Sequence, residues 1–384
     1  MFAVFQQFFI LGWISFGGPA AHLGYFHKTF VEKLHWLSDK EYAQLVALSQ
    51  FLPGPGSSQV GFALGYHRAG LPGAIAAFAG FTLPSVILML GLGLLSETGT
   101  QNPLFQGAVH GLKLLAVVVI ADAIRGMAAN ACQCNLTAGL AIATAVVLLL
   151  MPGLENQMIM LIIAAISGYL WFKLQTSTTD TIKNTQATLN WIPLTFFMLL
   201  LVGLPLIRYL GAPLQLFADF FHAGSLVFGG GHVVLPLLQT SLADQLSDDS
   251  FLTGYAIAQA VPGPMFTLAT YLGYQLLPSA PISGALLATV GIFLPGFLLL
   301  LAVLKNWQIL AARPSVSAAI QGVNASVVGL LLAALYQPVF ISAVGSATDI
   351  ALILVGLFLL QRLKLPIVVL VVIFTLCGLG GVYL

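Results

Sequence analysis

The stretch "LSQFLPGPGSSQVGF", from Leu48 to Phe62, places two prolines and two glycines inside an otherwise apolar segment. Proline removes a backbone donor and blocks the helical turn before it, whereas glycine adopts backbone conformations that other residues avoid. A second copy, "IAQAVPGPMFTLATY", runs from Ile257 to Tyr271. The two copies predict helices that stop and restart within hydrophobic surroundings.

The composition indicates that these surroundings are a membrane. Of the 384 residues, 59% are hydrophobic and only 7% are charged, and the mean hydropathy is +0.99. Soluble domains carry about 25% charged residues, so the polar surface here is too small to cover a water-soluble particle. We therefore predict an all-α polytopic protein of the plasma membrane, in contact with the lipid bilayer.

Charge and motif content narrow the partners. The net charge of +1, without a basic cluster, argues against nucleic acid. The three cysteines lack the spacing of a metal or redox site, and no ATP-binding G-x-x-x-x-G-K-[ST] motif is present. We expect no cofactor, no metal and no enzymatic activity.

Short motifs recur in the same order in the two halves of the chain, which indicates an internal duplication. The expected units are a first repeat over residues 1–175, a polar linker with a connecting span over 176–212, and a second repeat over 213–384. The polar stretch itself runs from Lys173 to Asn190. The matching pairs, in addition to the two PGP motifs, are "FGGP" from Phe16 with "FGGG" from Phe228, "LSDKEY" from Leu37 with "LSDDSF" from Leu246, "FTLPS" from Phe81 with "IFLPG" from Ile292, and "FQGAV" from Phe105 with "IQGVN" from Ile320.

Apolar runs near the length of a bilayer crossing divide the chain into thirteen segments. Two of them contain the FGG motifs and two contain the PGP motifs. The segments are 2–26, 43–67, 71–95, 104–126, 136–151, 154–172, 191–210, 214–240, 251–277, 282–304, 316–336, 338–360 and 365–384.

Basic residues concentrate in cytoplasmic loops, and this rule predicts the topology. If the PGP segment enters and leaves the membrane on one side, the basic residues of the first repeat share one face. The basic residues of the second repeat then lie on this same face only if that repeat is inverted in the membrane. The residues are Lys28, Lys33, Lys40, Arg68, Arg125, Lys173 and Lys183 in the first set, and Lys305, Arg313, Arg362 and Lys364 in the second.

We therefore predict inverted-topology repeats, each with re-entrant hairpins at its FGG and PGP turns and four crossings. One connecting span brings the total to nine crossings, with the N-terminus cytoplasmic and the C-terminus outside. Broken helices that cross fully remain an alternative, and hydropathy alone suggests twelve or thirteen crossings.

A helix that restarts within the membrane offers free N–H groups and a positive dipole end, which bind anions. Hydroxyl and amide side chains near the breaks add donors without a fixed charge. Small polar residues also permit tight helix packing, so that alternative stays open. The candidate donors are Gln50, Ser57, Ser58 and Gln59 in the first repeat, and Gln259 and Thr267 in the second.

Lys113 lies midway along an apolar segment, where a charge is costly and marks a pathway or a counter-ion. We predict that it binds substrate or couples its transport, with a structural pair as the alternative. His110 lies one turn earlier. His22 and His232 follow the FGG turns, and these three histidines are candidates to relay a proton or contact an anion.

The FGG turns, the paired Q-x-x-P-G-P breaks and the F-L-P-[SG] segments, each in two copies, closely resemble the chromate ion transporter family in its long form. The resemblance covers nearly the whole chain. It implies export of chromate, a tetrahedral dianion, and a role in chromate resistance. It assigns the substrate site to Gly17, Gly18, Gln50, Pro53, Gly54 and Pro55, and to Gly229, Gly230, Gln259, Pro262, Gly263 and Pro264.

Other functions are kept beside this one. The substrate could be another oxyanion such as sulfate, and a carrier of cations or lipid headgroups conflicts with the scarcity of intramembrane acids. An intramembrane hydrolase using Ser57 or Ser58 lacks a G-x-S-x-G elbow. Carriers often dimerise, so a homodimer is an expectation that the sequence leaves open.

Overall fold

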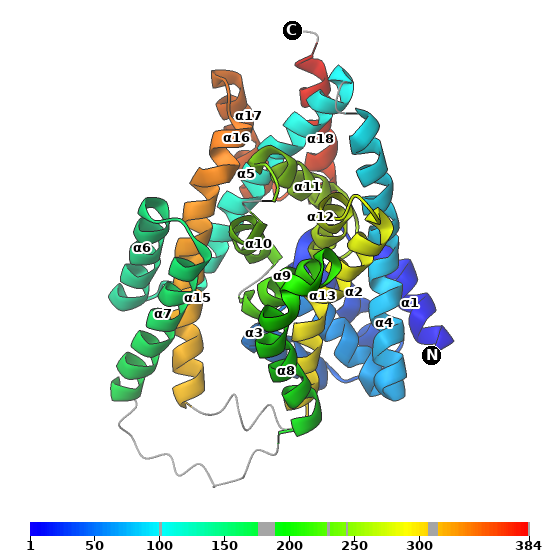
Figure 1. The fold of residues 1–384 in the computed structure, drawn as a ribbon, viewed down its shortest axis with the longest axis vertical. Coiled ribbons are helices and arrows are strands. Elements are labelled where there is room, and N and C mark those ends of the chain that lie inside the picture. The colour runs from blue at the N-terminus through cyan, green and yellow to red at the C-terminus, as the bar shows by residue number, and fades with distance from the viewer. Residues whose placement is uncertain (100–101, 176–188, 229–230, 243–244, 306–313, 383–384) are drawn as a thin grey trace.

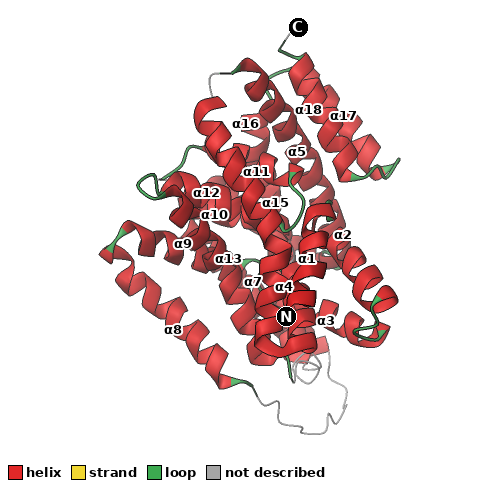
Figure 2. Cartoon of the chain, turned by 90° about the vertical axis from the view of Figure 1, so that its right-hand side faces the viewer, coloured by secondary structure: helices red, strands yellow, loops and turns green. Residues whose placement is uncertain are grey.

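The computed structural model describes residues 1–99, 102–175, 189–228, 231–242, 245–305 and 314–382. Within these ranges every regular element is a helix, as the sequence predicts (Figures 1 and 2). The N-terminus lies in the lower part of Figure 1, and the C-terminus lies at its upper end.

The first half of the chain begins with short helices and continues with long ones. Its elements are α1 (Phe2–Ile14), α2 (Gly18–Phe26), the π-helical turn η1 (His27–Lys33), α3 (Asp39–Phe51), α4 (Gly56–Gly99), α5 (Pro103–Ala131), α6 (Asn135–Leu150) and α7 (Leu154–Gln175).

After α8 (Trp191–Ile207) and the short turn η2 (Arg208–Leu210), the second half follows the same order. Its elements are α9 (Ala212–Leu226), η3 (Gly231–Val233), α10 (Val234–Leu242), α11 (Asp248–Ala260), η4 (Met265–Thr267), α12 (Leu268–Leu276), α13 (Pro281–Val303), α15 (Pro314–Ala334), η5 (Leu335–Phe340), α16 (Ile341–Ala343), α17 (Ala347–Gln361) and α18 (Ile367–Gly380).

The PGP motifs break the helices where the sequence predicts. Leu52 and Val261, which precede the first prolines, are extended, as residues before proline prefer to be. Gly54 and Gly263 then take φ values of +116° and +95°, a region that favours glycine. The chain therefore turns a corner at each PGP motif before the next helix starts.

At the first PGP motif the chain folds back on itself. α3 starts at a capping box in which Ser38 Oγ accepts the Glu41 N–H and the Glu41 carboxylate accepts the Ser38 N–H. Near the far end of this hairpin, the Arg68 guanidinium lies 5.5 Å from the centre of the Trp36 ring. α4 is interrupted at Ala69 and Gly70, whose backbone angles are not helical, so Arg68 ends its first part. Because Trp36 precedes α3, the two arms of the hairpin run antiparallel.

At two further breaks, the first FGG turn and the second PGP motif, the helices on either side contact each other. Phe8 of α1 packs on Phe26 of α2, with ring centres 5.4 Å apart. In the second half, Gly254 of α11 contacts the Tyr271 ring of α12 so closely that a Cβ on Gly254 would lie 2.5 Å from it. Each of these contacts joins the two arms that flank a break.

The corners of one half are bonded to the other half. Gly54 N–H donates to the Val227 carbonyl at 2.7 Å, and Gly263 N–H donates to the Ser15 carbonyl at 2.8 Å. Ser15 and Val227 occupy equivalent positions, each directly before an FGG motif. The two hydrogen bonds are therefore reciprocal, as a two-fold relation between the halves requires.

The long helices also interlock across the halves. α5 packs along α18, and α15 packs along α7. Both crossings are tight, because a Cβ on Gly378 would meet the Gly107 carbonyl and one on Gly322 would meet the Ala164 carbonyl. Gly107 and Gly322 are equivalent in the repeated "QG" motifs.

Within the described ranges, six helical segments are long and apolar enough to cross a membrane. The predicted count of nine is not reached by length, since α6, α17 and α18 have 16, 15 and 14 residues and a straight crossing needs about 20. The six segments are Gly56–Ser96, Pro103–Ala131, Leu154–Trp171, Trp191–Leu210, Pro281–Val303 and Ser317–Ala343.

Two segments differ from the prediction. The expected segment 338–360 is not one helix, because α16 ends at Ala343 and α17 begins at Ala347. Its expected start agrees with the structure, since Gln337 has non-helical φ and ψ values of −129° and 118°. The polar stretch is shorter than expected at its start, since α7 continues to Gln175. Most of the predicted linker, residues 176–188, lies outside the described residues, as do Lys183 and Arg313.

Candidate functional site

The first PGP corner leads directly into an α-helix. α4 starts at Gly56, and the first N–H groups of an α-helix have no partner within it. The Ser57 and Ser58 side chains belong to this first turn and are buried. The corner thus brings bare N–H groups and two hydroxyls to one buried place, which can accept a negative ligand.

His22 joins this corner from the neighbouring FGG hairpin. Its Nδ1 lies 3.2 Å from Ser57 Oγ, and its ring packs edge-on against Phe81 with centres 5.2 Å apart. Only 1% of the residue is exposed. Its Nε2 has no hydrogen-bond partner among the described residues.

Buried polar atoms without partners gather in the first half. A buried polar atom that forms no hydrogen bond is rare in folded proteins and calls for an explanation. Among the described residues, five of the six such side-chain atoms lie on α2, on α4 or directly after α1. They are Ser15 Oγ, His22 Nε2, Ser58 Oγ, Gln59 Oε1 and Thr82 Oγ1.

At the second PGP corner, the polar side chains form hydrogen bonds to atoms of the corner itself. Thr267 Oγ1 donates to the Pro264 carbonyl at 2.7 Å, and its N–H donates to the same carbonyl at 3.0 Å. The Gln259 amide donates to Met265 Sδ at 3.2 Å. The two corners are therefore chemically different, although their sequences match.

The histidine of the second half is also paired. His232 Nδ1 lies 2.9 Å from Tyr255 Oη. Its predicted neighbours in the FGG turn, Gly229 and Gly230, lie outside the described residues. In the first half, Gly17 and Gly18 have φ values of +100° and +75°, so that turn needs both glycines.

The two glutamines predicted as anion donors near the first corner, Gln50 and Gln59, do not face the buried start of α4 with free donors. Gln59 Nε2 donates to the carbonyls of Pro53 and Gly296 at 2.9 and 3.1 Å, so its donors hold the corner and are not free for a ligand. Gln50 is exposed in a cavity of about 500 Å³. This amide cavity is lined by uncharged polar side chains that include Gln321 and Asn324 of α15.

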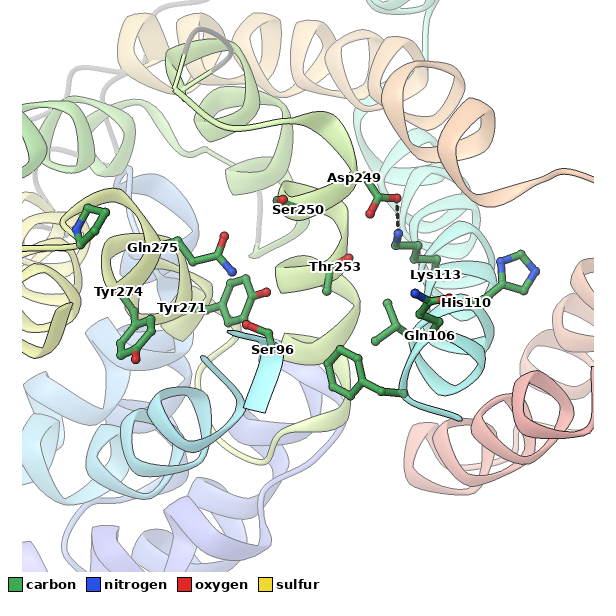
Figure 3. Close-up of a pocket in the computed structure, with 13 residues that line it drawn as sticks. Ser96, Gln106, His110, Lys113, Asp249, Ser250, Thr253, Tyr271, Tyr274 and Gln275 are labelled. Atoms are coloured by element: carbon green, nitrogen blue, oxygen red, sulfur yellow. Dashed lines mark hydrogen bonds and ion pairs between the residues drawn. The ribbon is translucent and has the colours of Figure 1, made fainter. Parts of the chain in front are cut away.

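Lys113 is buried but paired. Its Nζ lies 2.5 Å from Asp249 Oδ1 of α11, in a cavity of about 610 Å³ between α5, α11 and α12 (Figure 3). The sequence placed Asp249 in a loop, so this pair was not expected. His110 has a different partner, Asp349 of α17, whose Oδ1 lies 2.9 Å from its Nε2.

Sequence reasoning missed three residues that matter here: Ser15, Thr82 and Asp249. Ser15 directly precedes the FGG motif, and this adjacency was the available signal. Thr82 lies inside the repeated "FTLPS" motif, where its hydroxyl could have been noted. The Asp249 carboxylate is 136 residues from Lys113, and no local pattern links them. The described part of the chain holds no cluster of three metal-ligand side chains.

Comparison with known proteins gives the family. The model of the chromate transporter family matches residues 2–169 and 214–382, one match in each half. The chain is 27% identical to the chromate transport protein of Cupriavidus metallidurans over 95% of this chain and 89% of that one. It is 27% identical to a probable chromate transport protein of Synechococcus elongatus, over 97% and 93%.

A chromate transport protein of Pseudomonas aeruginosa is 28% identical over 86% of this chain and 78% of its own length. No solved structure matches the chain. These relatives are named as transport proteins, so the chain is a transport protein and not an enzyme. The family and the six helices suited to a bilayer among the described residues make it a multi-pass protein of the cytoplasmic membrane. The chain belongs to the chromate transporter family.

Proposed function

We propose that this protein is a secondary carrier that exports chromate from the cytoplasm and binds it at the first PGP corner. Family membership and the names of the relatives support chromate transport. The observation that carries the site is the pair of unpartnered buried atoms at the start of α4, Ser58 Oγ in its first turn and Nε2 of His22, whose other ring nitrogen contacts Ser57 Oγ. Chromate carries two negative charges on four oxygens, which suits a site built from several neutral donors.

The first half is the better anion site. Ser58 Oγ and His22 Nε2 lack partners there, whereas the equivalent Thr267 hydroxyl is bonded to the Pro264 carbonyl. The turn that follows the second corner is 3₁₀-helical, and it already uses the Thr267 N–H. The second corner then has a structural task, because Gly263 holds the Ser15 carbonyl.

The proposed topology is inverted, with nine crossings and re-entrant hairpins. The contact between Arg68 and Trp36 supports a hairpin whose ends meet on one face. In Figure 1, α3 lies toward the end that holds the N-terminus, while α11 lies toward the end that holds the C-terminus. Non-helical corners inside a membrane are tolerated where protein surrounds them, and broken helices in inverted repeats are typical of secondary transporters.

Labelling tests the inversion. Single cysteines at positions 40 and 248, in a background without Cys132, Cys134 and Cys377, should react with an impermeant maleimide from opposite sides of the membrane. Both positions are exposed, and they are the second residue of α3 and the first residue of α11. The caps Ser38 and Ser247 are avoided because losing an N-cap costs about 1 kcal/mol. Labelling of both positions from one side would refute the inverted arrangement.

The membrane potential can drive export. Moving one charge through 100 mV is worth about 2.3 kcal/mol, and a dianion gains about twice that on leaving a negative cytoplasm. The chain has no G-x-x-x-x-G-K-[ST] motif. A uniporter or an exchanger therefore suffices.

The test of function is chromate uptake into inside-out vesicles, with sulfate, molybdate and phosphate as competitors. We expect saturable uptake of chromate that depends on the protein and is inhibited by sulfate, because both are tetrahedral dianions. Uptake no greater than in vesicles without the protein would contradict the proposal. Inhibition by sulfate at lower concentrations than chromate itself would make sulfate the substrate.

The site within the first half has its own test. Ser58→Ala removes one donor to an anion, an interaction worth about 1.5–3 kcal/mol when the partner is charged, so half-saturation should rise about tenfold or more. Thr267→Val in the equivalent position is the matched control and should leave half-saturation unchanged. If only Thr267→Val raises it, the anion binds in the second half.

A further inference from the structure

The Lys113 cavity lies away from the PGP corners. Its walls come from α5 of the first half and from α11 and α12 of the second half (Figure 3). Asp249 is near the start of α11, eleven residues before Ala260, which corresponds to roughly 16 Å along the helix. No residue that lines the cavity belongs to a PGP motif or to the first turn of α4, so the cavity is separate from the site proposed at the first corner.

The ion pair in this cavity is unequal in its burial. The Lys113 side chain is 9% exposed and the Asp249 side chain is 74% exposed. A lysine in apolar surroundings is costly without a counter-charge, so the ammonium needs an anion beside it. The carboxylate loses little by returning to water, because it is already mostly hydrated. Lys113 is the fixed member of the pair, and Asp249 is the exchangeable one.

Further donors line the same cavity. Ser250 and Thr253 lie on α11 next to Asp249, and Tyr271 and Gln275 lie on α12 across the cavity (Figure 3). Hydroxyl and amide groups can donate to oxygens that the ammonium does not reach. The cavity volume of about 610 Å³ leaves room for a tetrahedral oxyanion together with water.

The ion pair has no counterpart in the other half. Lys113 aligns with Val328 through the "QG" motifs, and Asp249 aligns with Lys40 through the "LSD" motifs. The amide cavity, which Gln50 and Gln321 line, holds no charged side chain. A pair that the fold itself required would recur in both halves, so its presence in one half indicates a task specific to one face.

We propose that the Lys113 cavity is a second oxyanion site on the exit path, in which the Asp249 carboxylate holds the lysine between transport cycles. The departing oxyanion displaces Asp249 from Lys113 and then leaves to the outside, after which the carboxylate returns. The inference rests on the proposed function, since it needs an oxyanion to arrive from the first corner. Beyond that function, the inference identifies the Asp249 carboxylate as the group that competes with the oxyanion for Lys113, and it assigns this competition to the outer face.

Efflux of chromate from loaded right-side-out vesicles tests this, with external sulfate as the probe of the outer site. Asp249→Asn should lower the sulfate concentration for half-inhibition by about tenfold, because a like charge beside the bound anion is removed. Lys113→Met, alone or together with Asp249→Asn, should abolish the inhibition. Asp249→Glu keeps the charge and should behave as wild type.

The outcomes separate the two proposals. If the wild-type protein exports no chromate, the proposed function fails. If it exports chromate but Asp249→Asn leaves sulfate inhibition unchanged or weaker, the second site is refuted and the carrier remains. Should Asp249→Asn not reach the membrane, Thr253→Val keeps the ion pair and removes one donor. It should weaken sulfate inhibition about threefold, and no change would overturn the second site.

Discussion

The Gly263→Val variant should transport no chromate above the level of vesicles without protein. Gly263 has a φ of +95°, which a β-branched residue avoids, and such strain costs about 1–3 kcal/mol. A side chain there would also collide with Ser85 Oγ. Ser85 cannot withdraw freely, because it donates to the Pro262 carbonyl at 2.6 Å.

Replacing Gly263 should displace the second PGP corner and, through it, the proposed anion site at the first corner. Gly263 N–H holds the Ser15 carbonyl, and Ser15 lies beside His22 at the first corner. The variant should therefore remain in the membrane but lose transport. Gly203→Val in α8 is the control, since nothing lies within 4 Å of a Cβ at that position. Normal transport by Gly263→Val would show that the corner does not need glycine.

A double variant separates the effect of the backbone strain at Gly263 from that of the collision with Ser85. Gly263 faces Ser85, whereas Gly54 at the first corner faces Gly296, the residue equivalent to Ser85 in the other half. Gly296 has no side chain, so no such collision exists at Gly54. Gly263→Ala combined with Ser85→Gly removes the collision but keeps the unfavourable φ. Recovery of transport relative to Gly263→Ala alone would assign the loss to the collision.

The Gly322→Leu variant should fail to accumulate as folded protein. Gly322 lies where α15 crosses α7, and a Cβ there would overlap the Ala164 carbonyl and lie 3.1 Å from Gly168 Cα. Backbone atoms cannot rotate away, so the helices must separate, at a cost above about 3 kcal/mol. Because that crossing joins the two halves, its loss should affect the whole molecule.

Fluorescence-detected size exclusion measures this outcome in detergent extracts. We expect the monodisperse peak of Gly322→Leu to disappear. Gly139→Leu on α6 is the matched control, because a Cβ at Gly139 has no heavy atom within 4 Å. A wild-type peak for Gly322→Leu would mean that the two helices can move apart without loss of the fold.

Features encoded locally could be predicted from the sequence. Proline and glycine located both PGP breaks, and the order of repeated motifs located the halves. Basic residues suggested that α3 returns to its starting face, and the contact of Arg68 with Trp36 fits that interpretation. In each case a few neighbouring residues carry the physical cause.

Features that depend on distant residues could not be predicted. The partner of Lys113 comes from the opposite half, and the unpaired state of Ser58 depends on which groups fail to reach it. Hydropathy also cannot distinguish a short helix such as α18 from a complete crossing, because both are equally apolar.

The exchange of backbone bonds between the halves bears on biosynthesis. As the ribosome delivers the first half, Gly54 has no acceptor, because Val227 has yet to be translated. The first corner can reach its final form only after the second half has been inserted beside it. A polypeptide containing the first half alone would lack the carbonyl that Gly54 N–H requires.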